Sequence, residues 1–262
     1  TEAEKVLREV YAQMLDKSIP MLVTDYATAE LVKVAANAFL ATKISFINAM
    51  AEVCEATGAD VGMLAEAIGH DDRIGPKFLK AGLGFGGGCL PKDIRAFRAR
   101  AGELGVDDAL SFLREIDEIN MRRRQRAVEM TREAMGGSLL GSVVICLGAA
   151  FKPNSDDVRD SPALNVAAAL QLQGAQVRVT DPEAIDNARK LFPTLTYVES
   201  VEEAMVGADA VVLLTEWAQF RSLDPVAMKS LVRRPTIVDT RNALDPTYWR
   251  GAGWTYRSVG RP

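Results

Sequence analysis

The chain has 262 residues, 48% hydrophobic and 25% charged, enough for one large globular domain or two ordinary ones. The net charge of −4 comes from 31 basic and 35 acidic side chains spread along the chain, so neither nucleic acid nor a membrane surface is a predicted partner. Three cysteines without a CxxC pair argue against a disulfide framework and against a metal site. The sequence shows no signal segment and no apolar run of the length a bilayer needs, which predicts a cytoplasmic protein.

The N-terminal half is predicted to be helical. Residues 1–15 form a helix, and the short apolar stretch "SIPMLVTD" after it is predicted as a strand, as at the end of a domain that began earlier. Residues 28–57 form a long, largely buried helix, with Thr28 as its N-cap and Gly58 as its end signal. A helix at 60–69 and a Gly-rich, charged loop at 69–93 follow, with short helices beyond that loop.

The C-terminal half is predicted to be α/β. A helix over 107–137 links it to the helical half. Continuous apolar runs then alternate with helical segments, which is typical of a parallel sheet with helices on both faces. The predicted strands lie at 142–150, 176–181, 195–198, 209–215, 235–240 and 254–259, with helices at 161–172, 183–192, 200–206 and 224–231. Ligands of such sheets bind at the carboxyl ends of the strands, here the loops 148–162, 180–184, 215–217 and 239–245.

The stretch "GFGGGCLPKD", residues 84–93, is the strongest chemical signal. The spacing Gly82, Gly84, Gly87 matches a dinucleotide fingerprint. That fingerprint needs a strand before it and a helix that opens from it, whereas here "GPKFLKA" precedes and Cys-Leu-Pro follows, so we reject that interpretation. Glycines here are expected to let a ligand approach the main chain closely, with Cys89 exposed to it. Cys54 and Cys146 lie in apolar patterns and are predicted to be core residues.

A thiol is a strong nucleophile when positive charge stabilises its thiolate, and Lys92 and Lys33 are the candidates. The single histidine, His70, is interpreted as a surface residue, so the proton acceptor is expected to be Lys33 or Asp93. Lys33 and Asn37 stand four apart on the long helix and share a face. A snorkelling lysine and a capped asparagine explain that pair equally well.

Five ordered blocks cover nearly the whole chain and resemble the UDP-glucose 6-dehydrogenase family: "ELVKVAANAFLATKISFIN", "DDRIG", "FLKAGLGFGGGCLPKD", "AAFKPNSDDVRDSPA" and "DTRNALD". The resemblance implies a two-step oxidation of the C6 alcohol of UDP-glucose to a carboxylate with two NAD. It further implies that Cys89 attacks the intermediate aldehyde, giving a thiohemiacetal and then a thioester.

The same resemblance assigns the other site residues. Asp93 would orient the hydrolytic water, and Lys33 and Asn37 would act as general acid/base or oxyanion stabilisers. Lys92 and Arg159 would face NAD. The implied substrate contacts are Arg73, reaching a neighbouring subunit, with Phe78, Lys80, Gly84, Phe85, Gly86, Phe151, Lys152 and Arg241. A homodimer through the central helical domain would then be part of the site.

The resemblance also divides the chain. Residues 1–27 would be a remnant of an N-terminal NAD-binding domain, 28–137 the central helical domain, and 138–262 a C-terminal Rossmann-like domain for the UDP-sugar. The 262 residues are therefore expected to bind UDP-glucose and to dimerise without turnover. GDP-mannose 6-dehydrogenase is the first alternative, with the UDP-N-acetylmannosamine branch less favoured. A nucleotide-sugar-binding or dimerisation module without catalysis is another, and a 3-hydroxyacid dehydrogenase would leave the cysteine loop unexplained.

Overall fold

The computed structural model describes residues 1–261, which cluster into two compact units, residues 1–36 and the residues from Asn37 onward. The first unit holds α1 (Glu2–Val10), α2 (Ala12–Leu15) and the first turns of α3 (Tyr26–Thr57). Thr1 and Glu4 form a capping box at the start of α1. Residues 18–25, predicted as the strand that ends a domain begun earlier, are assigned no strand and are mostly exposed. A strand needs a partner, and the described sheet does not include these residues.

Helix α3 starts two residues earlier than predicted. Asp25, not Thr28, is the cap: its Oδ1 accepts from the Thr28 backbone N at 2.8 Å, and its Oδ2 accepts from the Thr28 hydroxyl at 2.8 Å. The predicted end is confirmed. Gly58 has φ 78°, and its N donates to the Cys54 carbonyl at 2.9 Å, so the chain leaves the helix through a left-handed glycine.

By length and composition alone, α3 could cross a bilayer, which the sequence analysis did not expect. The core helix of a folded domain passes the same test, and the polar residues of α3 fit that explanation. Ser45 is fully buried and donates to the Ile116 carbonyl at 2.9 Å, and the buried Asn48 accepts from the Gly82 N at 2.8 Å. These bonds belong to packing against other parts of the same protein.

The helical part of the second unit continues with α4 (Val61–Gly69), α5 (Leu90–Glu103), the 3₁₀ turn η1 (Asp107–Leu110) and α6 (Phe112–Ala134). The single helix predicted over 107–137 is therefore a 3₁₀ turn followed by a 23-residue helix. Asp60 caps α4 as its Oδ1 accepts from Gly62 N at 2.6 Å. A small core of Ala38, Ala41, Phe85, Ile94, Leu113 and Ile116 joins α3, α5, α6 and the glycine-rich loop.

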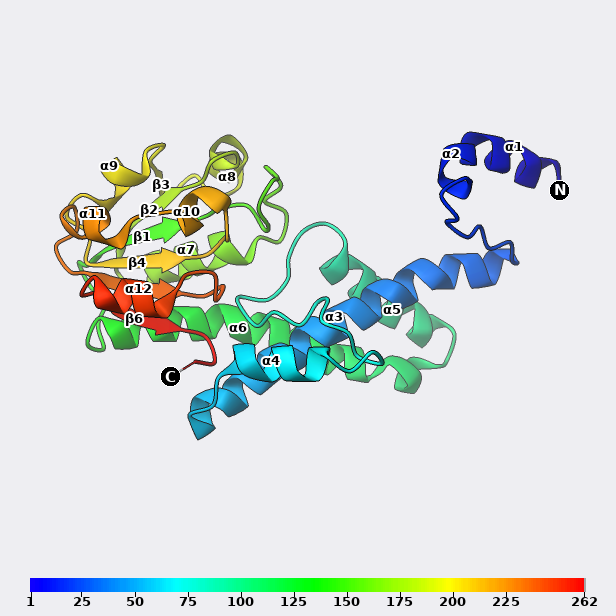
Figure 1. The fold of residues 1–262 in the computed structure, drawn as a ribbon, viewed down its shortest axis with the longest axis horizontal. Coiled ribbons are helices and arrows are strands. Elements are labelled where there is room, and N and C mark those ends of the chain that lie inside the picture. Colours follow the sequence, from blue (N-terminus) through cyan, green and yellow to red (C-terminus); the bar gives the residue numbers. More distant parts are fainter. Residues whose placement is uncertain (262) are drawn as a thin grey trace. The chain divides into compact units, whose positions relative to one another are not determined.

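The C-terminal part is a six-stranded, fully parallel sheet in the order β3-β2-β1-β4-β5-β6, which confirms the predicted α/β class (Figure 1). This is the order of doubly wound dinucleotide-binding sheets, with its switch point between β1 and β4. The strands are β1 (Val143–Leu147), β2 (Gln176–Thr180), β3 (Thr196–Tyr197), β4 (Ala210–Leu213), β5 (Thr236–Asp239) and β6 (Thr255–Ser258). The helices are α7 (Pro162–Leu172), α8 (Ile185–Leu191), α9 (Val201–Met205), α10 (Ala218–Arg221), α11 (Pro225–Lys229) and α12 (Pro246–Gly251). All six predicted strands are present, whereas α10 and α12 were not expected.

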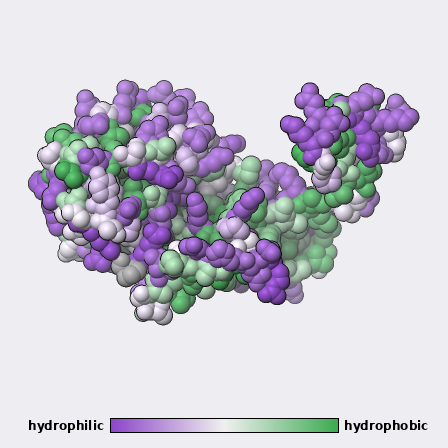
Figure 2. Space-filling view, in the orientation of Figure 1, coloured by the Kyte–Doolittle hydropathy of each residue, from purple (hydrophilic) through white to green (hydrophobic). Residues whose placement is uncertain are grey.

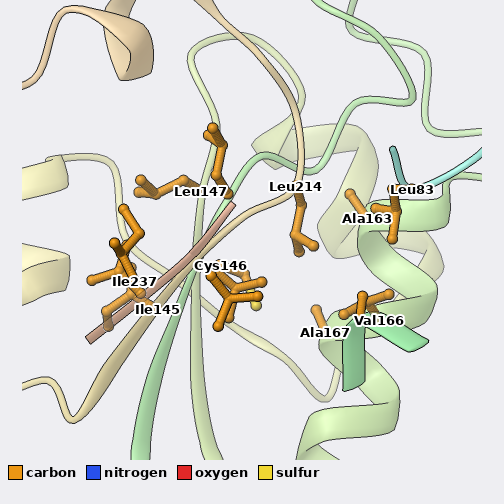
Figure 3. Packing of buried hydrophobic residues seen from close by; sticks show 14 of the residues in the cluster. Leu83, Ile145, Cys146, Leu147, Ala163, Val166, Ala167, Leu214 and Ile237 are labelled. Carbon is orange, nitrogen blue, oxygen red and sulfur yellow. The ribbon is translucent and has the colours of Figure 1, made fainter. Parts of the chain in front are cut away.

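One large core spans the sheet and reaches the helical part. Cys146 is completely buried in β1, as predicted, and Cys54 is 2% exposed in α3. Figure 3 shows Leu83, from the glycine-rich loop, on the α7 side of the residues that pack against β1. The loop that carries the cysteine is thus fixed to the sheet by an apolar anchor as well as to the helices.

The first testable prediction concerns Asp209, which precedes β4. Its Oδ2 accepts from the Val143 N at 2.9 Å, and Arg233 donates Nε to its Oδ1 at 2.7 Å. The Arg233 hydrogen bond holds the pKa of Asp209 below its ordinary value, against the opposing effect of burial. Asp209→Asn should therefore lower the free energy of unfolding at pH 7 by about 1–3 kcal/mol.

Since the folded-state pKa is lowered, this stabilisation is complete above the ordinary carboxyl pKa and is lost as pH falls through the lowered value. Urea unfolding at a series of pH values should show the difference between wild type and variant shrinking below about pH 4. Asp186→Asn is the control, because that carboxylate is 88% exposed and pairs only with Arg189 at 3.5 Å. A difference that does not change with pH would contradict the assignment.

Candidate functional site

Cys89 lies at the N-cap of α5 and is exposed. Its carbonyl accepts from the Asp93 N at 2.9 Å, and Pro91 occupies the first turn of the helix. The sequence analysis placed the helices beyond Asp93, although a proline and an acidic residue so close together are typical of a helix start. Cys89 therefore lies at the positive end of a 14-residue helix dipole, a source of positive potential that the sequence analysis missed.

Three of the four expected catalytic residues come together here. The Asn37 Nδ2 donates to the Asp93 Oδ2 at 2.7 Å and so joins α3 to α5, while Asp93 is only 6% exposed. Asp93 follows Cys89 by one helical turn, which puts both on the same face of α5. Lys92 Nζ lies 3.4 Å from the Asp93 Oδ1, with 72% of its side chain exposed. Lys33 belongs to the first unit, in the turn of α3 before Asn37.

Arg159 reaches the cysteine loop from the segment after β1. Its Nε and Nη2 donate to the two carboxylate oxygens of Asp157 at 3.0 and 2.7 Å. A Cβ on Gly88 would stand 2.7 Å from the Arg159 guanidinium carbon, so the guanidinium lies against the residue before the cysteine. The hydrogen bonds that Arg159 donates to Asp157 raise the pKa of Arg159, and the charge of Cys89 contributes in the same direction. Arg159, expected to face NAD, is thus also a positive charge next to the thiol.

The glycines of this loop are surrounded by protein. A Cβ on Gly82 would lie 3.0 Å from the Thr240 carbonyl oxygen, and one on Gly87 2.8 Å from the Phe151 ring. A Cβ on Gly84 would meet the Asn120 Oδ1, and one on Gly86 would meet the Asp160 carbonyl. The sequence analysis expected this space for a ligand. In the structure, the absence of side chains on these glycines lets the loop pack between α6 and the loops at the carboxyl ends of the strands.

Phe85 also differs from its expected role as a substrate contact. Its side chain is 6% exposed and packs in the small helical core with Ile94 and Leu113. Both of its backbone groups are bound by Asn120: the Phe85 N donates to Oδ1 at 2.7 Å, and Nδ2 donates to the Phe85 carbonyl at 3.0 Å. Phe85 is therefore an anchor of the loop.

The other predicted contacts of the helical part are exposed. Arg73 pairs with its neighbour Asp71 at 2.7 Å and leaves 89% of its side chain exposed. Lys80 is exposed, and Phe78 is 44% exposed with φ 64°. A bulky aromatic residue in the left-handed region is costly, and such strain is concentrated at functional sites.

Three predicted contacts come from the loops after β1 and β5. Phe151 lies against Gly87, and the Lys152 Nζ is 5.5 Å from the centre of the Phe151 ring. Arg241 is 11% exposed and donates Nε to the Leu214 carbonyl at 2.7 Å and Nη1 to the Gly84 carbonyl at 3.3 Å. Its buried Nη2 has no hydrogen-bond partner, so one donor of this guanidinium is available at the edge of the sheet.

The sheet has the strand order of a dinucleotide-binding fold, but its residues do not fit a dinucleotide. NAD-binding sheets use an acidic residue after the second strand to bind ribose, and Asp181 is the residue at that place. Asp181 is 4% exposed, and its carboxylate accepts from the N–H groups of Ala149, Ala150, Glu183, Ala184 and the Trp217 indole. Residues 1–261 also contain no group of three or more His, Cys, Asp or Glu side chains placed to hold a metal ion.

Two sizeable cavities of about 500 and 520 Å³ lie elsewhere. The first is lined by the end of α3, by α6 and by β6, and it contains four arginines. Arg126 is paired with Glu55 and Glu133, each at 2.9 Å, and Arg261 with Asp60 at 3.4 Å. Two of the four arginines are thus paired with carboxylates, and none of the lining residues of either cavity belongs to the cysteine loop. We therefore place the site at Cys89.

Residues 27–122 match the family model described as "UDP-glucose/GDP-mannose dehydrogenase family, central domain", and residues 145–246 match the "UDP binding domain" of the same family. The chain belongs to this family. It contains the central domain, in which the cysteine loop lies, and the domain that supplies Phe151, Lys152, Arg159 and Arg241.

The similar relatives include UDP-glucose 6-dehydrogenase of Rhizobium meliloti (strain 1021), 43% identical over 99% of this chain and 59% of the relative. UDP-glucose 6-dehydrogenase TuaD of Bacillus subtilis (strain 168) is 43% identical over 93% of this chain and 52% of the relative. A solved UDP-glucose dehydrogenase from Pyrobaculum islandicum superposes with a TM-score of 0.85 at 38% identity, covering 100% of this chain and 57% of that one. The chain thus spans a little over half the length of these proteins.

The second testable prediction follows from the packed glycines. Gly86→Ala places a methyl group against the Asp160 carbonyl and 2.6 Å from the Pro162 Cδ, neither of which is a flexible side-chain end. We expect it to lower the free energy of unfolding by about 1–3 kcal/mol, measured by urea titration. Gly251→Ala in α12 is the control, since nothing lies within 4 Å of its Cβ position. Equal stability of the two variants would show that the loop is not tightly packed.

Proposed function

We propose that this chain is the substrate-binding and thiol-bearing part of a UDP-glucose 6-dehydrogenase. The observation that carries the proposal is an exposed thiol at the start of α5, with the hydrogen-bonded pair Asp93–Asn37 one turn along and the Arg159 guanidinium on the other side. A purely structural cysteine would be buried, as Cys54 and Cys146 are.

In the proposed chemistry the Cys89 sulfur, as thiolate, adds to the C6 aldehyde carbon of the substrate. The carbonyl π electrons move to oxygen, which takes up a proton, and the product is a thiohemiacetal. After its oxidation to a thioester, water attacks the acyl carbon, the carbon–sulfur bond breaks and the thiolate leaves, releasing the carboxylate product. The oxidation of the C6 alcohol to the aldehyde and the oxidation of the thiohemiacetal each need a hydride acceptor, which is NAD in the proposed reaction. The described residues do not form a complete site for NAD.

The neighbouring residues take complementary roles in this proposal. Asp93 accepts a hydrogen bond from the water that attacks the thioester, and Asn37 fixes its carboxylate through the 2.7 Å bond across to α3. Asn37 and Lys33 stabilise the oxyanion, and Lys33 exchanges its proton. Arg159 and Lys92, both exposed beside the thiol, face the hydride acceptor.

The nucleotide end of the substrate is assigned to the loops after β1 and β5. Arg241 has one free buried donor there, and Lys152 and Phe151 offer a charge and an aromatic face for a diphosphate and a uracil ring. Phe78 and Lys80 would contact the substrate from the helical part. The family description of residues 145–246 as a UDP-binding domain supports uridine over guanosine, which is why GDP-mannose remains the alternative.

We further propose a homodimer through α3. Phe39, Phe46 and Val53 are 66%, 48% and 52% exposed, and their seven-residue spacing places them along one face of the helix. In Figure 2 apolar residues are more frequent over the helical elements than over the visible face around the sheet, which is mostly hydrophilic. An apolar stripe of this kind is self-complementary, so a second copy about a two-fold axis is the occupant that fits it.

The dimer would also bring Arg73 to the site of the partner. Lys43 of α3 donates to the Ile74 carbonyl at 2.8 Å and the Gly75 carbonyl at 3.2 Å, so the loop that carries Arg73 is tied to α3. An arginine that is 89% exposed there can reach a neighbouring subunit. We place the protein in the cytoplasm, since its three cysteines are free thiols, as in a reducing compartment.

The third testable prediction is calorimetric. The 262-residue chain should bind UDP-glucose more tightly than GDP-mannose, and Lys152→Gln should weaken binding about fivefold by removing a charge beside the diphosphate. Lys190→Gln on α8 is the matched control. Cys89→Ser and alkylation of Cys89 should leave affinity within about twofold, because the thiol contacts the sugar only during the reaction.

Tighter binding of GDP-mannose would move the assignment to the alternative branch, and binding of neither nucleotide would overturn the proposal. In an active preparation that includes these residues, Cys89→Ser should abolish oxidation while nucleotide binding persists. A binding module without catalysis predicts no such loss. The 262 residues alone should not reduce NAD, because their sheet does not fit a dinucleotide.

The fourth testable prediction concerns the dimer. Phe46→Glu puts a charge in the centre of the apolar stripe and should convert a dimer into a monomer, measured by light scattering during size-exclusion chromatography. Val206→Glu is the control, because Val206 is an equally exposed apolar residue, 56% exposed, in the sheet part. A wild-type chain that elutes as a monomer at all concentrations would refute this interface.

A further inference from the structure

Asn120 of α6 is completely buried, yet it contacts neither an ion nor another side-chain amide. Both of its side-chain hydrogen bonds go to one residue of the cysteine loop. Its Oδ1 accepts from the Phe85 N at 2.7 Å and its Nδ2 donates to the Phe85 carbonyl at 3.0 Å. A side-chain amide thus pairs with this residue as a neighbouring strand would, which fixes the position and the direction of the chain there.

The backbone of the loop at Gly84 is shaped to admit the Asn120 side chain. Gly84 has φ 89° and would carry a Cβ in contact with the Asn120 Oδ1, so the missing side chain leaves room for the amide. Phe85 itself is held from the other end by its ring, buried beside Ile94 and Leu113. Backbone and side chain of one residue are therefore both fixed, four residues before Cys89.

Two further contacts show what this fixed residue controls. The next turn of the loop is closed by Gly87 N, which donates to the Arg159 carbonyl at 2.9 Å, and by Gly86 against Asp160. Arg159 then lies over Gly88, beside the thiol. A shift of Phe85 would be transmitted to the contact between Gly88 and the Arg159 guanidinium and to the start of α5.

Asn48, Arg123 and Asn120 all make hydrogen bonds to the backbone of the loop, but they differ in how many. Asn48 of α3 makes one bond to the loop, accepting from Gly82 N at 2.8 Å, and its buried Nδ2 has no hydrogen-bond partner. Arg123 reaches the Gly82 carbonyl only at 3.4 Å and is also paired with Glu52 at 3.3 Å. Asn120 alone of these three satisfies both backbone groups of a loop residue.

We propose that Asn120 is a positioning residue: its amide holds the loop at Phe85 so that Cys89 stays at the N-terminus of α5 beside Arg159. The consequence for catalysis rests on the proposed function, since it assumes that Cys89 is the nucleophile. The positioning itself does not, and it can be measured on the thiol. Asn120 does not touch the thiol. It acts through the loop, whose position determines where the thiol lies.

The fifth testable prediction uses a nitroxide attached to Cys89, the one exposed thiol of the three. Asn120→Ala should increase the mobility of this label in its electron paramagnetic resonance spectrum and should raise amide hydrogen exchange at Phe85 about tenfold. Thr131→Val is the matched control on the same helix. Thr131 is equally buried, but its hydroxyl bonds to Ala127 at 2.8 Å and not to the loop. It should lower stability without changing the label or the exchange at Phe85.

If Asn120→Ala does not fold, Asn120→Asp gives the same comparison, because it keeps the acceptor for Phe85 N and loses the donor to the Phe85 carbonyl. An unchanged label and unchanged exchange at Phe85 would overturn the positioning role, whether or not UDP-glucose binds. Failure of wild type to bind UDP-glucose would overturn the proposed function and leave the label result standing. In an active preparation, Asn120→Asp should lower kcat about tenfold or more with KM little changed, whereas Thr131→Val should change neither.

Discussion

The close approach of a backbone loop to two walls of protein is the constraint on which the rest of the site depends. Residues 82–88 pass between α6 and the loops at the carboxyl ends of β1 and β5, with carbonyl oxygens, an aromatic ring and a guanidinium where side chains would otherwise stand. The helical part and the sheet therefore share one element. A change in the packing between the helical part and the sheet would shift the thiol, because Cys89 follows this loop directly.

The electrostatics of the thiol follow from the same arrangement. A lysine on a flexible stem was the expected source of positive charge, but Lys92 is turned to the Asp93 carboxylate at 3.4 Å. The structure supplies instead the N-terminal amides of α5 and the Arg159 guanidinium, which Asp157 holds in a bidentate contact. The amides are fixed by the helix backbone, whereas the guanidinium is held by its two side-chain hydrogen bonds to Asp157.

The sequence was a good guide where periodicity decides the structure and a poor one where packing does. The six strands and the helices α3, α4, α6 and α7 follow from apolar runs and caps, and the motif around Cys89 pointed to the site. The sequence did not reveal that the space beside the glycines is filled by Asn120, Asp160 and Phe151, because these residues lie 36 to 74 positions away or belong to another part of the fold. The strand predicted at 18–25 is not formed within residues 1–261, because an apolar pattern does not by itself provide a partner strand.

The buried amide of Asn48 shows why a helix as apolar as α3 belongs inside this fold, and Asn120 of α6 has a similar place against the same loop. A loop with consecutive glycines has no side chains to bury and exposes a peptide group at each residue, so its N–H and carbonyl groups need partners that do not come from a strand. Asparagine is short enough to reach those groups from a helix and offers a donor and an acceptor at once. Helices α3 and α6 thus each carry a buried asparagine at the point where the loop crosses them. These two asparagines make the interior less hydrophobic, but they bind the backbone of the loop and so fix the segment that precedes Cys89.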